Sequence, residues 1–422
     1  MVTARPGVGS AWISDAGIDF TLLTCVLFLQ RFSLSFGNSL MSLDIVPAGF
    51  ILLHQFATGR LVIQYDRALW FLAALIAVSS SLLLNFRSTM LPSYCLLVVI
   101  YSLFTLIKPS SKDQYRKTLY IFQLLVAVLS CLAAVQFIAQ FVLDARELIR
   151  FYGLVPDFLF ASFDTNRANT IIPVYEGSSL IKSNGIFLAE PSTMSQIAAL
   201  GILVEVLEFQ RLRYLMLLSL GLLLSYSGTG LMILLLFLPL AGLGRRAGSP
   251  VLLVLLLVSA LAMTGVIDSS VFLSRVGEFE NTGSSGFQRF ISPFWLAADH
   301  IATAPVANLL LGDGPGTTDA FVASYAVSYA GMAGTWIKLF YEYGFIGSFV
   351  FVCFFASCFR GSLSPRLLIV ALAIYFVFLG GLLLNTSFLI MTIVLCTLHS
   401  PVRQTNATGQ FHSPVARTAA AG

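Results

Sequence analysis

Long apolar runs separated by short polar connections extend along most of the 422-residue chain. A helix that crosses the hydrocarbon core of a bilayer needs about 20 mainly apolar residues, so the runs predict about twelve membrane-spanning helices, or about ten if the shortest and most closely spaced runs merge. The expected segments are 19–36, 43–58, 68–86, 90–107, 119–143, 187–207, 213–226, 229–243, 250–267, 336–358, 367–384 and 386–398. Because 57% of the residues are hydrophobic and only 10% are charged, the chain is expected to fold as an all-α, polytopic membrane protein.

Lysine and arginine gather in every second connection, which predicts the orientation of the chain. Basic residues in short loops stay on the cytoplasmic side, so both termini are expected to be cytoplasmic and the two long connections to face outward. These connections are rich in aromatic residues, and we expect them to pack on the membrane as short helices. The expected parts are an N-terminal bundle (1–143), a first outer loop (144–186), central helices (187–267), a second outer loop (268–335), C-terminal helices (336–400) and a cytoplasmic tail (401–422).

Several kinds of site are not predicted. The six cysteines lie within apolar runs, where they are expected to be small core residues and not disulfides or zinc ligands. The four histidines lack the paired spacing of a metal site, so we expect no metal and no cofactor. A net charge of +4 that is spread along the chain does not indicate a nucleic-acid partner.

Cationic side chains in the two outer loops are the first candidates for a binding site. A guanidinium is a planar fork of donors that matches phosphate, and lysine adds a compact charge, so converging loops could hold a diphosphate. Alternatively, the charges only solvate the loops, and Arg146 and Arg150 could form local helical pairs with Asp144 and Glu147. Arg289 is the stronger candidate because it lies in the aromatic-flanked stretch GFQRFISPFW. The other loop cations are Arg167, Lys182 and Arg275.

A carboxylate followed by proline stands at the start of an apolar run, in the stretch NGIFLAEPSTMSQIAALGILVE (184–205). Pro191 suits the first turn of a helix, where its missing N–H costs nothing, and the helix dipole would favour a carboxylate at Glu190. Glu190 could therefore belong only to a helix start. Alternatively, a partly desolvated carboxylate could act as a general base when a sugar hydroxyl attacks. Both interpretations are open at the level of the sequence.

Three further features each have a structural and a functional interpretation. SYSGTG (225–230) predicts a tight turn where helices approach closely. LLLGDGPGTT (309–318) predicts a glycine-rich turn, with phosphate binding by backbone N–H groups as the alternative, although the lysine of a phosphate-binding loop is absent. Asp44 and His54 could form a proton relay at the second run, but on a helix they are about 80° out of alignment.

The order of these motifs resembles the O-antigen polymerase and ligase superfamily. NGIFLAEPS opens a span, SGTG forms a turn, QRFISPFW lies in the second long outer loop, and GDGPG and WIKLFYEYGFIGS follow. The resemblance covers about residues 180–358 and is closest to the Wzy-type exopolysaccharide polymerases of Gram-negative bacteria. It implies a GT-C-like glycosyltransferase of the inner membrane that works on the periplasmic side, without a nucleotide sugar or a metal.

The resemblance also implies a reaction and a set of residues. Such proteins transfer a growing glycan from undecaprenyl diphosphate to the next lipid-linked repeat unit, and a flippase and a polysaccharide co-polymerase are the expected protein partners. By position, Arg289 matches an arginine of the second loop, and Lys182 or Arg167 is the counterpart in the first. We therefore predict Glu190 and Arg289 as catalytic residues. The predicted substrate-binding residues are Arg167, Lys182, Arg275 and Arg289.

Other functions remain as alternatives. O-antigen ligases of the superfamily carry a histidine where this sequence has Ala333, in GMAGTW, and its absence favours a polymerase. A secondary transporter would need intramembrane charges, broken helices and internal repeats, and only Asp44 and His54 favour that class. A non-catalytic assembly partner would not need two basic outer loops.

Overall fold

The computed structural model describes residues 15–36, 39–143, 172–174, 178–242, 280–282, 284–325 and 333–401. Within these ranges every predicted apolar run contains a helix, but the runs expected at 19–36 and 90–107 end in short strands. The run expected at 250–267 lies outside the described ranges. The apolar helices are α1 (Asp15–Phe28), α2 (Ile45–Ala57), α3 (Tyr65–Leu84), α4 (Leu91–Leu103), α5 (Lys112–Ala139), α6 (Pro191–Val204), α7 (Leu212–Leu224), α8 (Gly228–Gly242), α15 (Thr335–Cys358), α16 (Arg366–Phe378) and α17 (Thr386–Thr392). Short 3-10 or π-helical turns adjoin them at η1 (Ser88–Met90), η4 (Glu205–Phe209), η5 (Leu382–Leu384) and η6 (Ile393–Thr397).

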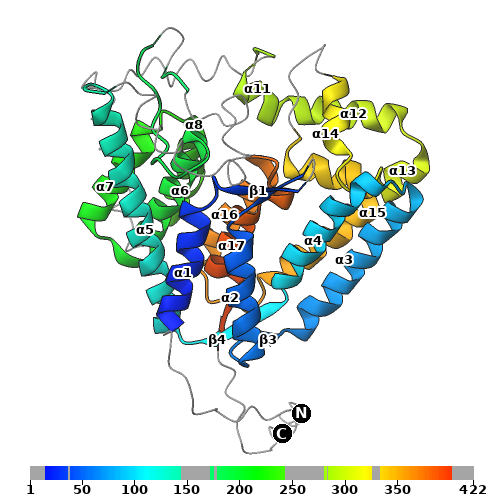
Figure 1. Ribbon diagram of the computed structural model, residues 1–422, viewed down its shortest axis with the longest axis horizontal. Helices are drawn as coiled ribbons and strands as arrows, with labels where there is room; N and C mark the ends of the chain where they lie inside the picture. Colours follow the sequence, from blue (N-terminus) through cyan, green and yellow to red (C-terminus); the bar gives the residue numbers. More distant parts are fainter. Residues whose placement is uncertain are drawn as a thin grey trace, which may run out of the picture.

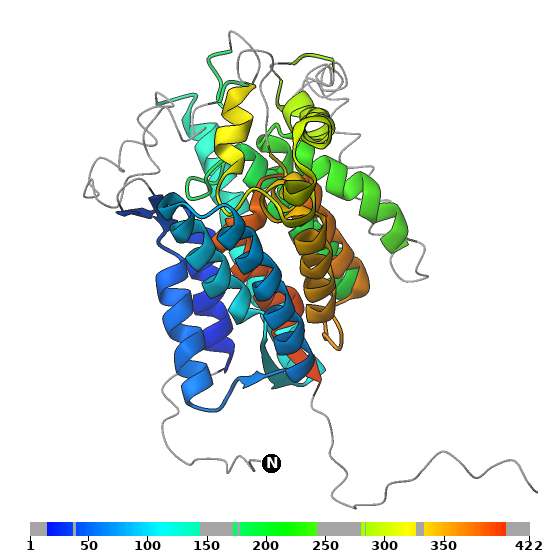
Figure 2. The same cartoon turned by 90° about the vertical axis from the view of Figure 1, so that its right-hand side faces the viewer.

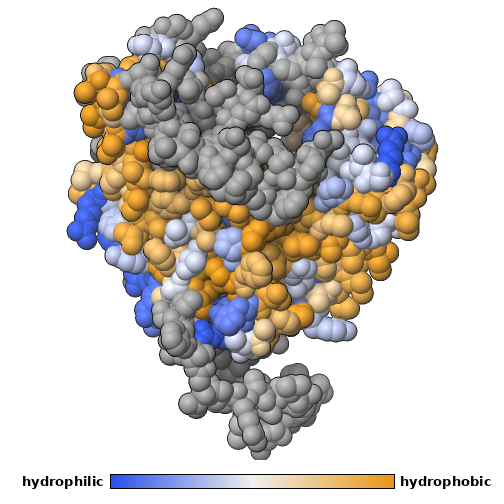
Figure 3. Space-filling view, viewed as in Figure 1, coloured by the Kyte–Doolittle hydropathy of each residue, from blue (hydrophilic) through white to orange (hydrophobic). Residues whose placement is uncertain are grey.

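Four helices among the described residues are long and apolar enough to cross a membrane: α3, α5, α6 with η4, and α15. The remaining apolar helices are shorter, so the number of crossings stays a prediction. Side chains such as Ile76 and Leu83 on α3 are exposed to 61% and 76%. Figure 3 shows a broad hydrophobic surface across the middle of the visible face, between more hydrophilic patches. An apolar surface of this kind is typical of a protein in contact with lipid.

Helix α6 is the central helix and α3 is peripheral. In the apolar window of α6 and η4, 72% of the residues are buried, against 28% in α3. Helix α6 packs against α7 and α8, and α5 lies beside it. Pro191 occupies the first turn of α6, as the sequence predicts. The site described below is therefore built at the start of the best buried of the four helices that are long enough to cross a membrane.

Two small sheets add to the helical architecture that the sequence predicts. Strands β1 (Ser33–Phe36) and β2 (Ser39–Ser42) form an antiparallel hairpin. Strands β3 (Val62–Ile63), β4 (Leu106–Ser110) and β5 (His399–Pro401) form a second sheet, in which β3 is antiparallel and β5 parallel to β4. The all-α description is therefore incomplete, because these strands are only two to five residues long and too short to give an alternating pattern.

The second outer loop forms short helices at one end of the molecule, as the sequence predicts. They are α11 (Ser285–Phe290), α12 (Ser292–Thr303), α13 (Val306–Leu311) and α14 (Thr318–Ser324), and they lie together at the top of Figures 1 and 2. At the opposite end, buried Asp19 of α1 lies 3.4 Å from Lys108 Nζ of β4 and 3.5 Å from His399 Nε2 of β5. The first and last described segments therefore meet at the end opposite to the second loop (Figure 1).

The glycine-rich turn GDGPG packs into a break in α15. Gly344 interrupts this helix with φ 65° and ψ −171°, and a Cβ there would lie 2.4 Å from the carbonyl of Leu310. The backbone N–H groups of Asp313 and Gly314 donate to the carbonyls of Tyr341 (2.9 Å) and Glu342 (3.0 Å). These donors bind α15, so the turn shapes the loop and does not present them to a phosphate.

Candidate functional site

Glu190 and Arg289, the two predicted catalytic residues, lie side by side. Glu190 precedes α6, Arg289 belongs to α11 nearly a hundred residues later, and Arg289 Nη2 lies 3.7 Å from Glu190 Oε2. Both side chains line a cavity of about 240 Å³. The fold therefore joins the start of the central helix to the second outer loop at one site.

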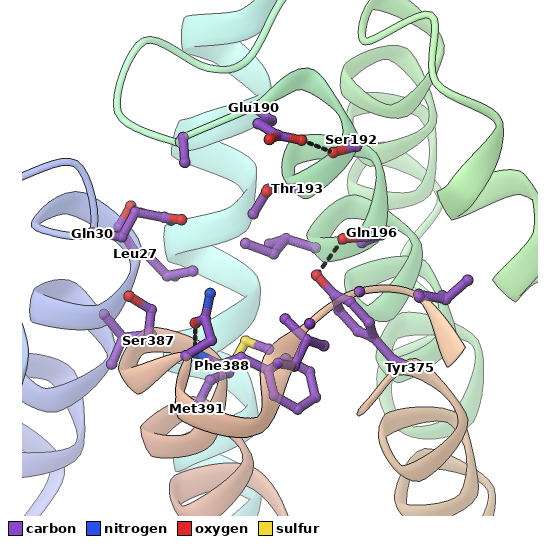
Figure 4. Close-up of a pocket in the computed structure, with 18 of the residues that line it drawn as sticks. Leu27, Gln30, Glu190, Ser192, Thr193, Gln196, Tyr375, Ser387, Phe388 and Met391 are labelled. Atoms are coloured by element: carbon purple, nitrogen blue, oxygen red, sulfur yellow. Dashed lines mark hydrogen bonds between the residues drawn. The ribbon is translucent and has the colours of Figure 1, made fainter. Parts of the chain in front are cut away.

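The Glu190 side chain does not cap its own helix. Glu190 is the N-cap residue of α6, in an extended conformation, but its carboxylate accepts no backbone hydrogen bond there. Instead, Ser192 Oγ donates to Glu190 Oε2 at 2.7 Å (Figure 4). The carboxylate is 36% exposed. It is thus held by a side chain at the cavity while part of it remains open to a ligand.

Arg289 reaches the cavity from a short helix whose start is fixed locally. The Ser284 hydroxyl accepts a hydrogen bond from the backbone N–H of Phe287 (3.1 Å), an N-cap of α11. The side chain of Arg289 is only 15% exposed. Its 3.7 Å contact with Glu190 is longer than a hydrogen bond. The guanidinium therefore faces a carboxylate that neutralises it without satisfying its donors.

Both polar and apolar side chains line the deeper part of the cavity. Tyr375 of α16 donates a short hydrogen bond to Gln196 Oε1 of α6 (Figure 4). Tyr375 lines the same cavity as Arg289 and Glu190. Apolar walls come from α1 and α17, where Leu27 and Met391 line the space. Such a mixed lining suits a ligand with both polar and hydrocarbon parts.

Asp44 fixes one wall of the cavity and does not pair with His54. Asp44 is fully buried and accepts hydrogen bonds from the hydroxyls of Thr386 (2.7 Å) and Ser387 at the start of α17. Ser387 lines the cavity. His54 is exposed and lies at the other end of α2. The proton-relay interpretation therefore has no geometric basis, and Asp44 acts as a positioning residue for α17.

The other predicted cations are not brought to this cavity within the described part of the chain. Lys182 is 9% exposed, its backbone N–H donates to Ile172 O at 2.9 Å, and it is not among the lining residues. Arg167 and Arg275 lie outside the described residues, as do Arg146 and Arg150. Their roles stay predictions.

The SYSGTG turn has the packing role that the sequence favours. Ser195 Oγ of α6 donates to Ser227 O (3.0 Å) and accepts from the backbone N–H of Gly230 (2.9 Å). A Cβ at Gly230 would lie 2.2 Å from the Ser195 carbonyl oxygen. The glycine is therefore required for α8 to approach α6.

Sequence reasoning missed the polar side chains of the deeper cavity. Gln196 and Tyr375 lie within apolar runs, and Gln30 and Asn385 lie near the ends of runs. Polar residues inside predicted spans are a signal of function, because a bilayer disfavours them. Polar residues in apolar runs also form hydrogen bonds between helices, so their presence in the sequence does not identify this cavity.

The position of the ligase histidine is part of a small apolar core. Ala333 is 7% exposed and packs with Leu296 and Ile337. His300 of the same loop lies elsewhere, with its ring 4.6 Å from that of Tyr341 and Nε2 3.5 Å from Asp313. Burial lowers the pKa of His300 below its usual value. Across the described ranges, no group of three or more histidine, cysteine or acidic side chains could hold a metal ion.

The sequence matches one family model along nearly its full length. Residues 20–400 match the model described as "WcaD colanic acid polymerase". No curated protein matches the sequence. The helical membrane architecture agrees with this match, and the matched range contains both Glu190 and Arg289. The chain therefore belongs to the WcaD colanic acid polymerase family, a family of Wzy-type exopolysaccharide polymerases.

Proposed function

We propose that this membrane protein joins lipid-linked repeat units on the periplasmic face of a bacterial inner membrane. It would transfer glycan from an undecaprenyl diphosphate carrier to the next lipid-linked repeat unit. One observation carries this proposal: Glu190 and Arg289 lie 3.7 Å apart at a cavity with both polar and apolar walls. A carboxylate and a guanidinium are the two groups that a base-assisted attack with an anionic leaving group requires.

Arg289 serves the leaving group in this mechanism. When the bond between the sugar C1 and the donor phosphate breaks, the diphosphate departs with the electron pair and gains negative charge. Among the described residues, the Arg289 guanidinium approaches Glu190 at 3.7 Å. A guanidinium stabilises the charge of the leaving group, and it can bind phosphate oxygens in a bidentate manner. Lys182, Arg167 and Arg275 remain proposed substrate-binding residues because of their charge.

Glu190 serves the acceptor. A hydroxyl of the incoming repeat unit attacks C1, the new glycosidic C–O bond forms, and its proton passes to the carboxylate of Glu190. Ser192 donates to Oε2 and so holds one oxygen in place. Arg289 Nη2 lies 3.7 Å from the same oxygen and so places the leaving-group side of the site next to the base. The two charged groups thus support both halves of the displacement.

The orientation of the chain rests on its basic residues. Arg360 and Arg366 flank the connection from α15 to α16, and Lys112 and Arg116 begin α5, at the end where β4 and β5 meet. The positive-inside rule makes this end cytoplasmic, with both termini, and makes the α11–α14 end periplasmic. A GT-C-like arrangement, and a flippase and a co-polymerase as partners, belong to the same proposal.

Purified protein in liposomes with lipid-linked repeat units tests the function directly. A polymerase gives a ladder of joined units on the carrier and releases undecaprenyl diphosphate, whereas a protein that only moves the lipid across the bilayer gives neither product.

A deletion strain separates polymerase from ligase. Polymerase loss leaves single lipid-linked units, and ligase loss leaves finished polymer on its carrier. The buried, apolar position of Ala333 favours the first result. Finished polymer on the carrier would refute the proposal.

A further inference from the structure

A second cavity opens at the same end of the molecule. Its walls come from the C-terminal end of α3, the turn that follows α13, the start of α14, and α15. Its volume is also about 240 Å³. None of the residues that line it lines the first cavity. Its polar and aromatic lining residues include Asn85, Arg87, Asp313, Thr317, Phe321 and Tyr341.

The wall formed by the GDGPG turn is rigidly held. Asn85 Nδ2 donates to Gly312 O (2.9 Å), and Thr317 Oγ1 donates to Gly314 O (2.7 Å). Asn308 Nδ2 donates to Asp313 Oδ1 at 2.6 Å. The turn is also docked on α15 through its backbone N–H groups. The Asp313 carboxylate is therefore fixed in position before any ligand arrives, which lowers the entropic cost of binding.

The chemistry of the lining fits a saccharide. The rings of Tyr341 and Phe321 stack with centroids 4.1 Å apart, and they provide an aromatic wall for the apolar face of a pyranose. Arg87 is exposed and can donate to a sugar hydroxyl or carboxylate, and Asp313 can accept from a hydroxyl. A few fixed polar groups beside aromatic rings are typical of a small-molecule site.

The second outer loop contributes to both cavities. Arg289 of α11 lines the first, and the segment from Asp313 to Phe321 lines the second, and the short helices between them run across one end of the molecule (Figure 1). A glycan of several sugars that reacts at the first cavity extends from the same face. We infer that the second cavity is a glycan subsite, which holds sugar residues away from the reacting bond and retains the glycan between additions.

This inference rests on the proposed function for its role in chain growth, but saccharide binding is tested separately. The probe is the carrier-free oligosaccharide of the repeat unit, titrated against purified full-length protein in detergent and followed by ligand-observed NMR. Arg87→Ala is expected to weaken oligosaccharide binding about tenfold, because it removes a hydrogen bond from a charged group. Tyr341→Phe keeps the aromatic ring and is expected to weaken oligosaccharide binding less than Arg87→Ala does. Arg360→Ala, an exposed arginine at the other end of α15, is the control.

A second readout measures chain growth in liposomes. Arg87→Ala is expected to raise the KM for the repeat unit much more than it lowers kcat, and to shorten the product ladder, with Arg87→Lys intermediate. Equal oligosaccharide binding by the wild type and Arg87→Ala would overturn the subsite. If the wild type binds the oligosaccharide through Arg87 but joins no units, the proposed polymerase activity fails while the saccharide site stands.

Discussion

Replacing Glu190 by glutamine separates its role in catalysis from its role in stability. Glutamine has nearly the same shape, so it keeps the hydrogen bond from Ser192 Oγ but cannot take a proton from an attacking hydroxyl. Loss of a general base costs about 10²–10⁴ in rate, which corresponds to about 3–5 kcal/mol of transition-state stabilisation. We therefore expect Glu190→Gln to join repeat units at least about a hundredfold more slowly than the wild type.

The structure predicts that Glu190→Gln changes the free energy of unfolding much less than the rate. The contact between Glu190 and Arg289 is 3.7 Å long, and the carboxylate is 36% exposed. Ion pairs of this kind contribute only about 0.2–1 kcal/mol because solvent screens them. The free energy of unfolding should therefore change by far less than the activation free energy, and the melting temperature by less than about 3 °C.

The assay compares initial rates of linkage with thermal unfolding of the same purified preparation. Ser192→Ala is the matched control, since it removes the donor that holds Oε2 and keeps the base, and we expect it to lower the rate about three- to tenfold through positioning. If Glu190→Gln retains more than a third of the wild-type rate while folded, Glu190 is not the base, and its carboxylate serves only as the partner of Ser192 and Arg289.

Three further predictions concern stability in detergent. Gly344→Ala should cost about 3 kcal/mol through strain and a backbone clash, whereas Gly361→Ala, with a similar φ but open space, should cost about 1 kcal/mol in denaturant titrations. Because the pKa of His300 is lowered in the folded protein, its neutral form stabilises the fold fully above about pH 6.5, and this stabilisation is lost as the pH falls through the folded pKa. The melting temperature should therefore fall from pH 7 to pH 5, and it should fall less in His300→Phe. Arg211→Ala should cost about 3 kcal/mol, because Glu205 is fully buried and loses a bidentate partner at 2.8 and 3.0 Å, and thermal unfolding would reveal it.

Hydropathy predicted the helices well because each span must be apolar on its own. Pro191 after a carboxylate predicted where α6 begins, and the aromatic flanks of Arg289 pointed to a packed loop. The break at Gly344 could not be predicted in the same way, since the helix is interrupted only because the GDGPG turn supplies donors to its carbonyls. The short strands were missed for a similar reason, because strand pairing depends on segments far apart in the sequence.

The candidate site was predicted in part. The sequence identified Glu190 and Arg289 separately by local chemistry, but their contact depends on how the second loop folds back over α6. Gln196 and Tyr375 were missed because a polar side chain in an apolar run can equally join two helices, and here they bond to each other. Asp44 was identified as unusual, yet its partners on α17 lie more than three hundred residues away.

Arg289 provides the most direct test of the central claim that repeat units are joined at this cavity. The measurement is complementation of a deletion strain with Arg289→Ala and Arg289→Lys, with membrane levels checked by immunoblot and lipid-linked glycan analysed by size. We predict that both variants reach the membrane, that Arg289→Ala accumulates single lipid-linked units, and that Arg289→Lys restores little polymer because it lacks the bidentate fork. Normal polymer from both variants would contradict the claim and remove Arg289 from the mechanism.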